Sequence, residues 1–279
     1  MKKDVSFVAC RVGRIIEWLE ELAPAALAES WDRVGLQIGD PDEEVWHVLV
    51  ALTLTQDVVE QAIAHGVQLI VVHHPPLFRP LGQIRWDRPD GNLLRQLVSA
   101  GISVYASHTN FDVASRGMND ILARRLELQE CEPLAYRPGG DESEGMGRVG
   151  SLAEAMEPEA FLRFVHERLE VSAVRCCGPM PERVRRVAVM GGSGASFIEA
   201  AHAAGADVFI TGDVDFHDAI HSNDLRLWTI DAGHFATERW VVPFWTEYLR
   251  DRASTEQVSL QVEAAVEHDP FWFRIEPIK

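Results

Sequence analysis

The sequence lacks any run of about 18 consecutive apolar residues, the length that a helix needs to cross a membrane. Residues 1–16 contain Arg11 and Arg14 and no uninterrupted apolar stretch of the kind found in a signal peptide. Only four cysteines occur, none in a C-x-x-C pair, so neither a disulfide framework nor a thiolate zinc site is expected. We therefore expect a cytoplasmic protein with free thiols and no membrane partner.

Basic residues are few in comparison with acidic ones. The 26 Lys and Arg against 43 Asp and Glu give a formal net charge of −17 and a pI of about 5.0. A nucleic-acid partner is not expected, since proteins that bind nucleic acid usually present a basic face. A phosphorylated small molecule stays compatible with this charge, because bound cations can reverse the local field.

The chain also lacks both common fingerprints for nucleotide phosphates. Residues 191–196 (GGSGAS) match neither G-x-G-x-x-G nor the GK[ST] ending of a P-loop. A strand is expected before these glycines and a helix after them, where backbone N–H groups can hold a phosphate. We favour the other interpretation, that the glycines permit a tight turn.

What the sequence does contain is a repeated helix–glycine–strand pattern. It occurs in AIAHGVQLIVVHH, LVSAGISVYASH and AAHAAGADVFITGD. Strands that alternate with helices of about 10 to 15 residues are typical of βαβ units and largely parallel sheets. The 279 residues, 47% of them apolar, suffice for one large domain or two small ones. The likeness of the first and third copies indicates an internal duplication.

Hydrophobic periodicity gives approximate bounds for the elements. Residues 137–147 hold four glycines and one proline, which predicts a flexible connection or a lobe boundary. Helices are expected over 7–22, 56–65, 91–100, 115–127, 158–170, 191–204 and 237–251. Strands are expected over 46–54, 67–72, 102–106, 148–153, 171–176, 184–190, 206–211, 226–230 and, at a sheet edge, 257–265.

Two adjacent histidines stand at the end of a buried strand. The apolar run 67–72 leads directly into His73 and His74, and two prolines then end the strand. Neutral imidazole is the commonest protein ligand for a divalent metal, so this placement indicates a metal site. The alternative is a pair of solvated loop histidines.

Other histidines and carboxylates follow the later strands. In open α/β sheets, ligand sites lie at the carboxyl ends of the strands. Histidine together with carboxylate is the ligand set of Zn, Mn, Fe and Ni sites. The residues in these positions are His108, Asp112, Asp213, His217, Asp231, His234 and Glu238.

Each of these residues also has a purely structural interpretation. Asp112 could cap the helix that follows it, and Glu238 could be a first-turn acid that complements a helix dipole. His217 and His221 could form one solvated helix face. Their joint placement after successive strands is what favours the metal interpretation.

The motifs ESWDRVGLQIGDP, VVHHPPLF, SHTNFDVASRGMND, GGSGASF, GADVFITGDVDFHDA and DAGHFATE, with a terminal DPFWF, occur in this order along the chain. Together they resemble the NIF-three-like family, whose bacterial members are known as GTP cyclohydrolase I type 2 homologues. The resemblance implies a dinuclear metal centre in a deep cleft between two similar, intertwined α/β/α lobes with mixed, largely parallel sheets. It also implies a ring-shaped homohexamer.

The resemblance also implies roles for particular residues. The metal ligands fall on His73, His74, Asp112, His234 and Glu238, holding two divalent ions per chain that could be Zn, Mn or Fe. His108 falls beside the site, and it or Glu238 is expected to move the proton in catalysis. The short separation of the motifs matches the insert-free form of the family.

The expected lobes are residues 1–130 with 235–279, and residues 131–234. Three positions depart from the family pattern, namely Arg33, Pro76 and Arg116. We expect them at the pocket rim, where they bear on the substrate more than on metal binding.

These observations lead to a hydrolase of a nucleotide-like small molecule as the first hypothesis. In the reaction that the family name implies, water attacks C8 of the guanine of GTP and formate is released. Surface arginines such as Arg79, Arg116 or Arg137 could meet the phosphates. The alternatives are a metal-binding regulatory or protein-interaction factor without turnover, and a nuclease working inside a ring, against which the net charge counts.

Overall fold

The computed structural model describes residues 9–272. The chain divides into two compact units. Within the described residues, unit 1 comprises 9–111 and Val241–Glu267, and unit 2 comprises Asp112–Trp240 and 268–272. The sequence placed the lobe boundaries near residues 130 and 234, and the units observed here change at residues 111 and 240. The expected helix at residue 7 begins, within the described part, at Val12.

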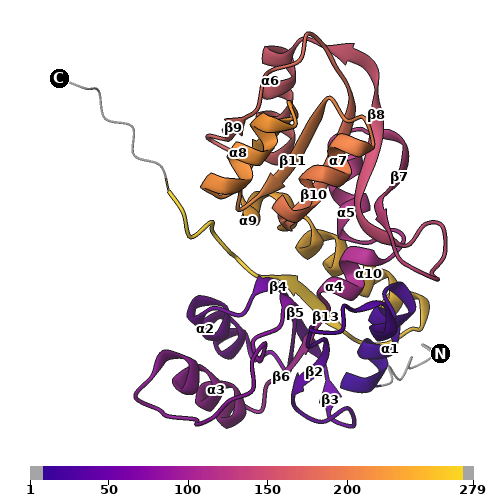
Figure 1. The fold of residues 1–279 in the computed structure, drawn as a ribbon. Coiled ribbons are helices and arrows are strands. Elements are labelled where there is room, and N and C mark those ends of the chain that lie inside the picture. Colours follow the sequence, from indigo (N-terminus) through magenta and orange to yellow (C-terminus); the bar gives the residue numbers. More distant parts are fainter. Residues whose placement is uncertain (1–8, 273–279) are drawn as a thin grey trace. The chain divides into compact units, whose positions relative to one another are not determined.

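Unit 1 is built on a five-stranded sheet in the order β13-β4-β5-β6-β2 (Figure 1). The three pairings among β13, β4, β5 and β6 are parallel, and β2 joins β6 antiparallel. The strands are β2 (Gly35–Ile38), β4 (His47–Thr53), β5 (Leu69–His74), β6 (Ser103–Ala106) and β13 (Gln261–Ala264). A separate two-stranded sheet pairs β1 (Cys10–Arg11) with β3 (Glu44–Val45).

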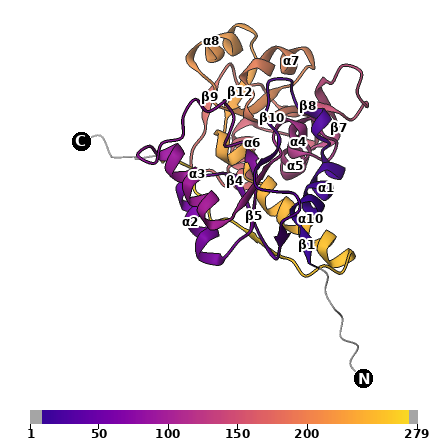
Figure 2. The same ribbon diagram turned by 90° about the horizontal axis from the view of Figure 1, so that it is seen from below.

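The helices of unit 1 begin and end where local chemistry dictates. Thr55 caps α2, and Gly66 and Gly101 adopt the left-handed conformation that ends α2 and α3. Figure 2 shows α2 and α3 lying side by side, as their packing requires. The helices are α1 (Val12–Leu22), η1 (Ala25–Leu27), α2 (Gln56–His65), α3 (Pro89–Ala100) and α10 (Val241–Thr255).

The register of unit 1 brings the carboxyl ends of its central strands to one edge of the sheet. Thr53 at the end of β4 is opposite His74 at the end of β5. β6 ends at Ala106, and His108 follows two residues later. Polar side chains that follow these strands therefore gather at one edge.

The C-terminal strand β13 completes the other side of this sheet. Beyond it, the carboxylate of Glu267 accepts hydrogen bonds from Leu52 N (2.7 Å) and Thr53 N (3.0 Å) and so ties the segment after β13 to the end of β4. Burial raises the pKa of Glu267, although these two N–H donors oppose the change.

Unit 2 holds a six-stranded sheet in the order β7-β8-β10-β11-β12-β9. Only the β10–β11 and β11–β12 pairings are parallel; the other three are antiparallel. The strands are β7 (Gln129–Tyr136), β8 (Gly145–Met156), β9 (Arg175–Cys177), β10 (Val184–Ser193), β11 (Val208–Gly212) and β12 (Trp228–Asp231). The α/β class with mixed sheets is confirmed, with more antiparallel pairing here than expected.

The helices of unit 2 flank its sheet. They are α5 (Met118–Arg125), α6 (Pro158–Leu169), η2 (Ala195–Phe197), α7 (Ile198–Ala203), α8 (Phe216–Asp224) and α9 (His234–Glu238), while α4 (Thr109–Val113) spans the junction of the units. The helix expected over 237–251 falls on two helices, α9 and α10, which a turn at Arg239 and Trp240 separates. None of the helices within residues 9–272 is both long and apolar enough to span a membrane.

The glycine-rich stretch 137–147 differs from expectation. It forms the turn of the β7–β8 hairpin, in which Tyr136 pairs with Gly145 and Arg137 N donates to Glu144 O at 3.1 Å. The hairpin lies within unit 2, so this stretch is not a lobe boundary. Its glycine, proline, aspartate and serine residues are those that favour turn conformations.

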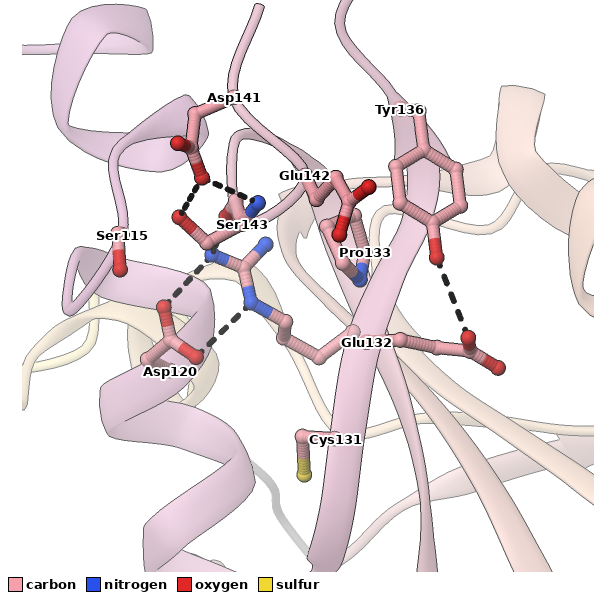
Figure 3. A pocket seen from close by; sticks show the side chains of 10 residues that line it. Ser115, Asp120, Cys131, Glu132, Pro133, Tyr136, Asp141, Glu142 and Ser143 are labelled. Carbon is pink, nitrogen blue, oxygen red and sulfur yellow. Dashed lines mark hydrogen bonds and ion pairs between the residues drawn. The ribbon is translucent and has the colours of Figure 1, made fainter.

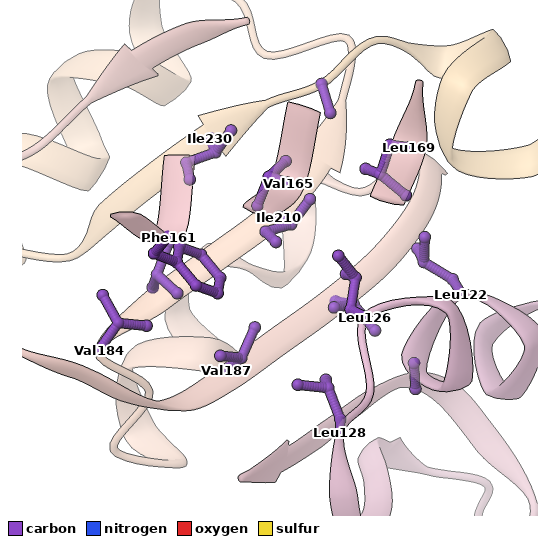
Figure 4. Packing of buried hydrophobic residues seen from close by; sticks show 14 of the residues in the cluster. Leu122, Leu126, Leu128, Phe161, Val165, Leu169, Val184, Val187, Ile210 and Ile230 are labelled. Atoms are coloured by element: carbon purple, nitrogen blue, oxygen red, sulfur yellow. The ribbon is translucent and has the colours of Figure 1, made fainter. Parts of the chain in front are cut away.

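Alternate residues of β10 pack into two separate hydrophobic cores, one on each face of the sheet of unit 2. Val187 and Val189 pack on one face of the sheet with residues of α5 and α6, whereas Ala188 and Met190 pack on the other face with α7. The first of these clusters is drawn in Figure 4. Unit 2 is thus a three-layer α/β/α arrangement by itself.

Phe161 is the aromatic centre of the larger core. It is fully buried, and its ring centroid lies 6.2 Å from that of Trp228. Phe161→Ala is expected to lower the free energy of unfolding by about 3–5 kcal/mol, because the substitution loses buried area and leaves a cavity. Urea denaturation followed by circular dichroism measures the change.

Phe164→Ala is the matched control, since Phe164 lies on the same helix and is only partly buried. Phe164→Ala is expected to lower the free energy of unfolding clearly less than Phe161→Ala does. Equal losses in the two variants would contradict the assignment of Phe161 to the core.

Candidate functional site

Three histidines of unit 1 gather at the carboxyl edge of its sheet. His73 and His74 end β5, and His108 follows β6. The ring centroids lie 5.1 Å apart for His73 with His74, 5.1 Å for His73 with His108, and 5.6 Å for His74 with His108. Each ring offers one ligand atom, and the three atoms lie within 4.8 Å of one another. The three rings are thus close enough together to offer ligands to one cation.

The two histidines of β5 are oriented through their Nδ1 atoms. His73 is fully buried, and its Nδ1–H donates to the carbonyl of Ser107 at 2.9 Å. His74 Nδ1 is hydrogen-bonded to Thr53 Oγ1 at 2.7 Å. A carbonyl can only accept, so neutral His73 keeps its lone pair on Nε2. Such fixed orientation by outer partners is typical of metal-ligating histidine.

His108 is held by a carboxylate that the sequence did not single out as a site residue. Its Nδ1–H donates to Asp32 at 3.0 and 3.1 Å. The same carboxylate accepts hydrogen bonds from Thr109 N (3.0 Å), Thr109 Oγ1 (2.6 Å) and Arg33 N (2.7 Å). Burial alone raises the pKa of Asp32, but the bonds from His108 and Thr109 outweigh it and hold the pKa well below its usual range. Asp32 is therefore an ionised partner for the imidazole.

Unit 2 contributes a second group of potential ligands. His234 and Glu238 are the first and last residues of α9, and their i,i+4 spacing puts them on one face. His234 Nε2 lies 2.8 Å from Glu238 Oε2, and Glu238 is buried. His234 Nδ1–H donates to Asp213 Oδ2 at 2.7 Å. Both ring nitrogens therefore meet carboxylates.

These two carboxylates control the charge of His234. Burial lowers the pKa of the imidazole, but hydrogen bonds and Coulomb attraction from Glu238 and Asp213 overcome this and raise the pKa to about 9. Below that pH the metal-free ring is cationic. Metal binding at Nε2 must compete with this proton.

Asp213 reaches the ring from a rare backbone conformation. Its φ is +55°, in the left-handed region that few non-glycine residues adopt. Asp is among the residues that tolerate this region best. The conformation places the carboxylate at hydrogen-bonding distance from His234.

The GGSGAS glycines make room for Glu238. A Cβ atom at Gly192, where φ is +62°, would lie 2.2 Å from Glu238 Oε1 and 3.2 Å from His234 Nε2. The N–H groups of Gly192 and Gly194 donate to Thr237 Oγ1 and Thr211 Oγ1. These N–H groups are engaged within the protein, which counts against a phosphate cradle. Gly191 and Gly192 lie at the end of β10 and not in the turn expected from the sequence.

The remaining predicted residues take different positions. Asp112 is buried at the start of unit 2, and its carbonyl accepts a bond from Asn119 Nδ2 at 3.0 Å. Asp231 accepts a bond from Gly233 N at 3.0 Å and so supports the entry to α9. Exposed His217 belongs to neither histidine group described here.

The donor set fits a divalent metal. Four histidines have Nδ1 bonded to a fixed partner, and three of these partners can only accept, which directs the lone pair to Nε2. Nitrogen and carboxylate oxygen suit Zn, Mn and Fe alike. The described residues thus include histidine and glutamate groups able to bind metal.

A cavity of about 740 Å³ lies elsewhere in unit 2 (Figure 3). Its lining is acidic, with Asp120, Asp141 and Glu142 among its residues. Its buried guanidinium, that of Arg148, is bonded to Asp120 (2.6 and 2.9 Å) and to backbone carbonyls of the hairpin. These bonds occupy the cation, so it braces the hairpin.

Asp213→Asn tests the electrostatic link to His234. The pKa of His234 in the metal-free protein is expected to fall below about 9, because a neutral amide does not stabilise the imidazolium, while Glu238, the stronger partner, still raises the pKa. Asn also tolerates the left-handed backbone. An NMR titration of the imidazole resonances measures the shift.

Asp215→Asn serves as the control, because Asp215 caps α8 and makes no bond to His234. A pKa that stays near 9 in Asp213→Asn would contradict the proposed link.

Comparison with known proteins agrees with this description. The family model of Duf34/NIF3 (NGG1p interacting factor 3) matches residues 10–270. A Streptomyces coelicolor protein named "GTP cyclohydrolase 1 type 2 homolog" is 38% identical over 234 residues, covering 82% of this chain and 81% of the relative. One of the same name from Clostridium perfringens is 32% identical over 263 residues, covering 94% and 99%. A solved Bacillus cereus protein related to NIF3 has a TM-score of 0.90 at 27% identity, covering 95% and 99%. The chain therefore belongs to the Duf34/NIF3 family.

Proposed function

We propose that this chain is a metal-dependent hydrolase of a nucleotide-like substrate, with GTP as the first candidate. The observation that carries the proposal is that His73, His74 and His234 are each held through Nδ1 by a partner of their own. Preorganised ligands of this kind are what a metal-dependent enzyme requires. The name shared by its relatives supports GTP as the starting point.

The metal ligands in this proposal are His73, His74, Asp112, His234 and Glu238, and the centre is dinuclear. Two divalent ions, when bound, lower the pKa of water and polarise the bond that is attacked. The ligands are oriented by the residues that bond their Nδ1 atoms, namely Ser107, Thr53 and Asp213.

His108 is suited to move the proton. Its Nδ1–H is bonded to ionised Asp32, which stabilises the imidazolium that forms when Nε2 accepts a proton. The side chain is partly exposed, so Nε2 can exchange that proton with a substrate or with water. Glu238 is the other candidate, with its carboxylate buried against Gly192.

Metal content is the first test. Protein purified without a histidine tag is expected to contain about two divalent ions per chain by elemental analysis. His74→Ala and Glu238→Ala are expected to lose most of this metal, because each removes a direct ligand.

His217→Ala is the matched control, since it removes an exposed histidine that lies outside both groups. Wild-type protein that takes up neither Zn, Mn nor Fe would refute the hydrolase proposal.

Turnover is the second test. Metal-loaded wild type is expected to release formate from GTP, and His108→Gln is expected to slow this by about 10²–10⁴-fold while folding normally. Formate assay and metal analysis on the same samples separate a loss of proton transfer from a loss of metal. Formate release that His108→Gln leaves at the wild-type rate would contradict the role of His108.

Full metal content without formate release would instead favour the regulatory alternative. The family description, which names an interacting factor, is the observation behind that alternative. The ring-shaped homohexamer and the cytoplasmic location stay predictions from the sequence.

A further inference from the structure

Two exposed aromatic rings adjoin the histidines of unit 1, and the proposed chemistry leaves them without a role. Trp31 is 53% exposed and Phe78 is 41% exposed. Their ring centroids lie 5.9 Å apart, with the planes at 68°. Single apolar side chains are common on protein surfaces, but a contacting pair beside candidate ligands indicates a binding function.

Both rings also contact His108. The centroid of Trp31 lies 6.3 Å from the imidazole at 76°, and that of Phe78 lies 6.5 Å from it at 84°. The three rings therefore stand edge to face, which is a favoured aromatic geometry. We call Trp31, Phe78 and His108 the aromatic corner. A flat molecule that packs on Trp31 or Phe78 is brought next to His108.

The backbone that carries Trp31 is restrained although its ring is exposed. The neighbouring Asp32 is buried and bonded to His108 and Thr109. Asp32 N donates to Glu29 O at 2.9 Å, and Glu29 N donates to Thr109 Oγ1 at 2.9 Å. These bonds tie the turn to the segment that holds His108. The ring is thus presented on a rigid support, which lowers the entropy cost of binding.

Phe78 is restrained in a different way. It follows His74 by four residues, and Pro75 and Pro76 lie between them. Proline rings fix φ, so the path from the histidine strand to Phe78 has few conformations. Both aromatic residues are therefore preorganised.

We propose that Trp31 and Phe78 form a stacking site for a planar heteroaromatic ring, specifically a purine base, of the substrate. This inference rests on the proposed function and adds the residues that recognise the base. Aromatic side chains stack on the faces of bases without needing a hydrogen-bond pattern. Stacking there places the base beside the proton-transferring imidazole of His108.

The local charge also suits a nucleotide. Exposed Arg33 directly follows buried Asp32 after Trp31, and exposed Arg79 directly follows Phe78. In a chain of net charge −17, these two guanidinium groups provide positive charge close in sequence to the aromatic corner. Arginine is well suited to binding phosphate.

Calorimetric titration of the metal-loaded protein tests the proposal. The probes are guanosine, which carries the base without phosphate, and tripolyphosphate, which carries phosphate without the base. Trp31→Ala and Phe78→Ala are each expected to weaken guanosine binding about tenfold or more. Binding of tripolyphosphate is expected to stay unchanged, and Trp31→Phe is expected to retain most of the affinity for guanosine.

Trp86→Ala is the matched control. Trp86 is 56% exposed in the same unit and lies outside the aromatic corner, with Arg95 stacked over it at 6.0 Å. The Trp86→Ala variant is expected to bind guanosine with the affinity of the wild type. Metal analysis of every variant shows whether the histidine group has remained intact.

Two results would overturn the proposal: no saturable guanosine binding by the wild type, or wild-type affinity in the double variant Trp31→Ala/Phe78→Ala. The assay needs no turnover, so it separates this inference from the proposed function. Guanosine binding that depends on Trp31, without formate release from GTP, would contradict GTP hydrolysis and support the stacking site. Formate release at the wild-type rate by the double variant would refute the stacking site alone.

Discussion

Imidazole nitrogen has to be bonded when it is buried, and this requirement governs the arrangement of the candidate site. His73 satisfies it through the carbonyl of Ser107, and His74 through the hydroxyl of Thr53. Thr53 ends the neighbouring strand β4, and Ser107 directly follows the end of β6, so the register of the sheet decides whether the rings are oriented. Orientation of the ligands is therefore a property of the whole sheet.

In unit 2 the same requirement is met with backbone conformations that are costly in isolation. Asp213 adopts positive φ to reach His234, and Gly192 lacks a side chain where Glu238 approaches. Such conformations persist when surrounding bonds over-determine them, and they concentrate at functional sites. The two carboxylates that fix the geometry of His234 also raise its pKa, so the metal-free ring stays protonated up to about pH 9.

Sequence analysis could single out His73, His74, His234 and Glu238 as candidate ligands, because strand ends and i,i+4 spacing are local patterns. It could not identify Asp32 as the partner of His108, since 76 residues separate them and nothing in the local pattern pairs them. It joined the end of α9 to α10 because hydrophobic periodicity continues across Arg239 and Trp240, which form a turn between the two helices. The α/β class was predictable because the helix–glycine–strand pattern repeats, whereas the antiparallel flanks of the second sheet depend on pairing between distant segments.

The edge strand β13 and Glu267 have a consequence for biosynthesis. The sheet, helices and cores of unit 2 are formed within one continuous segment, Asp112–Trp240, so they can assemble as soon as that segment leaves the ribosome. Unit 1 begins earlier but needs α10, β13 and the bonds between Glu267 and the end of β4, all of which are translated after the segment of unit 2. The half of the chain that is translated first is therefore the half that is finished last, and until then its histidine strand stands one position from an open sheet edge.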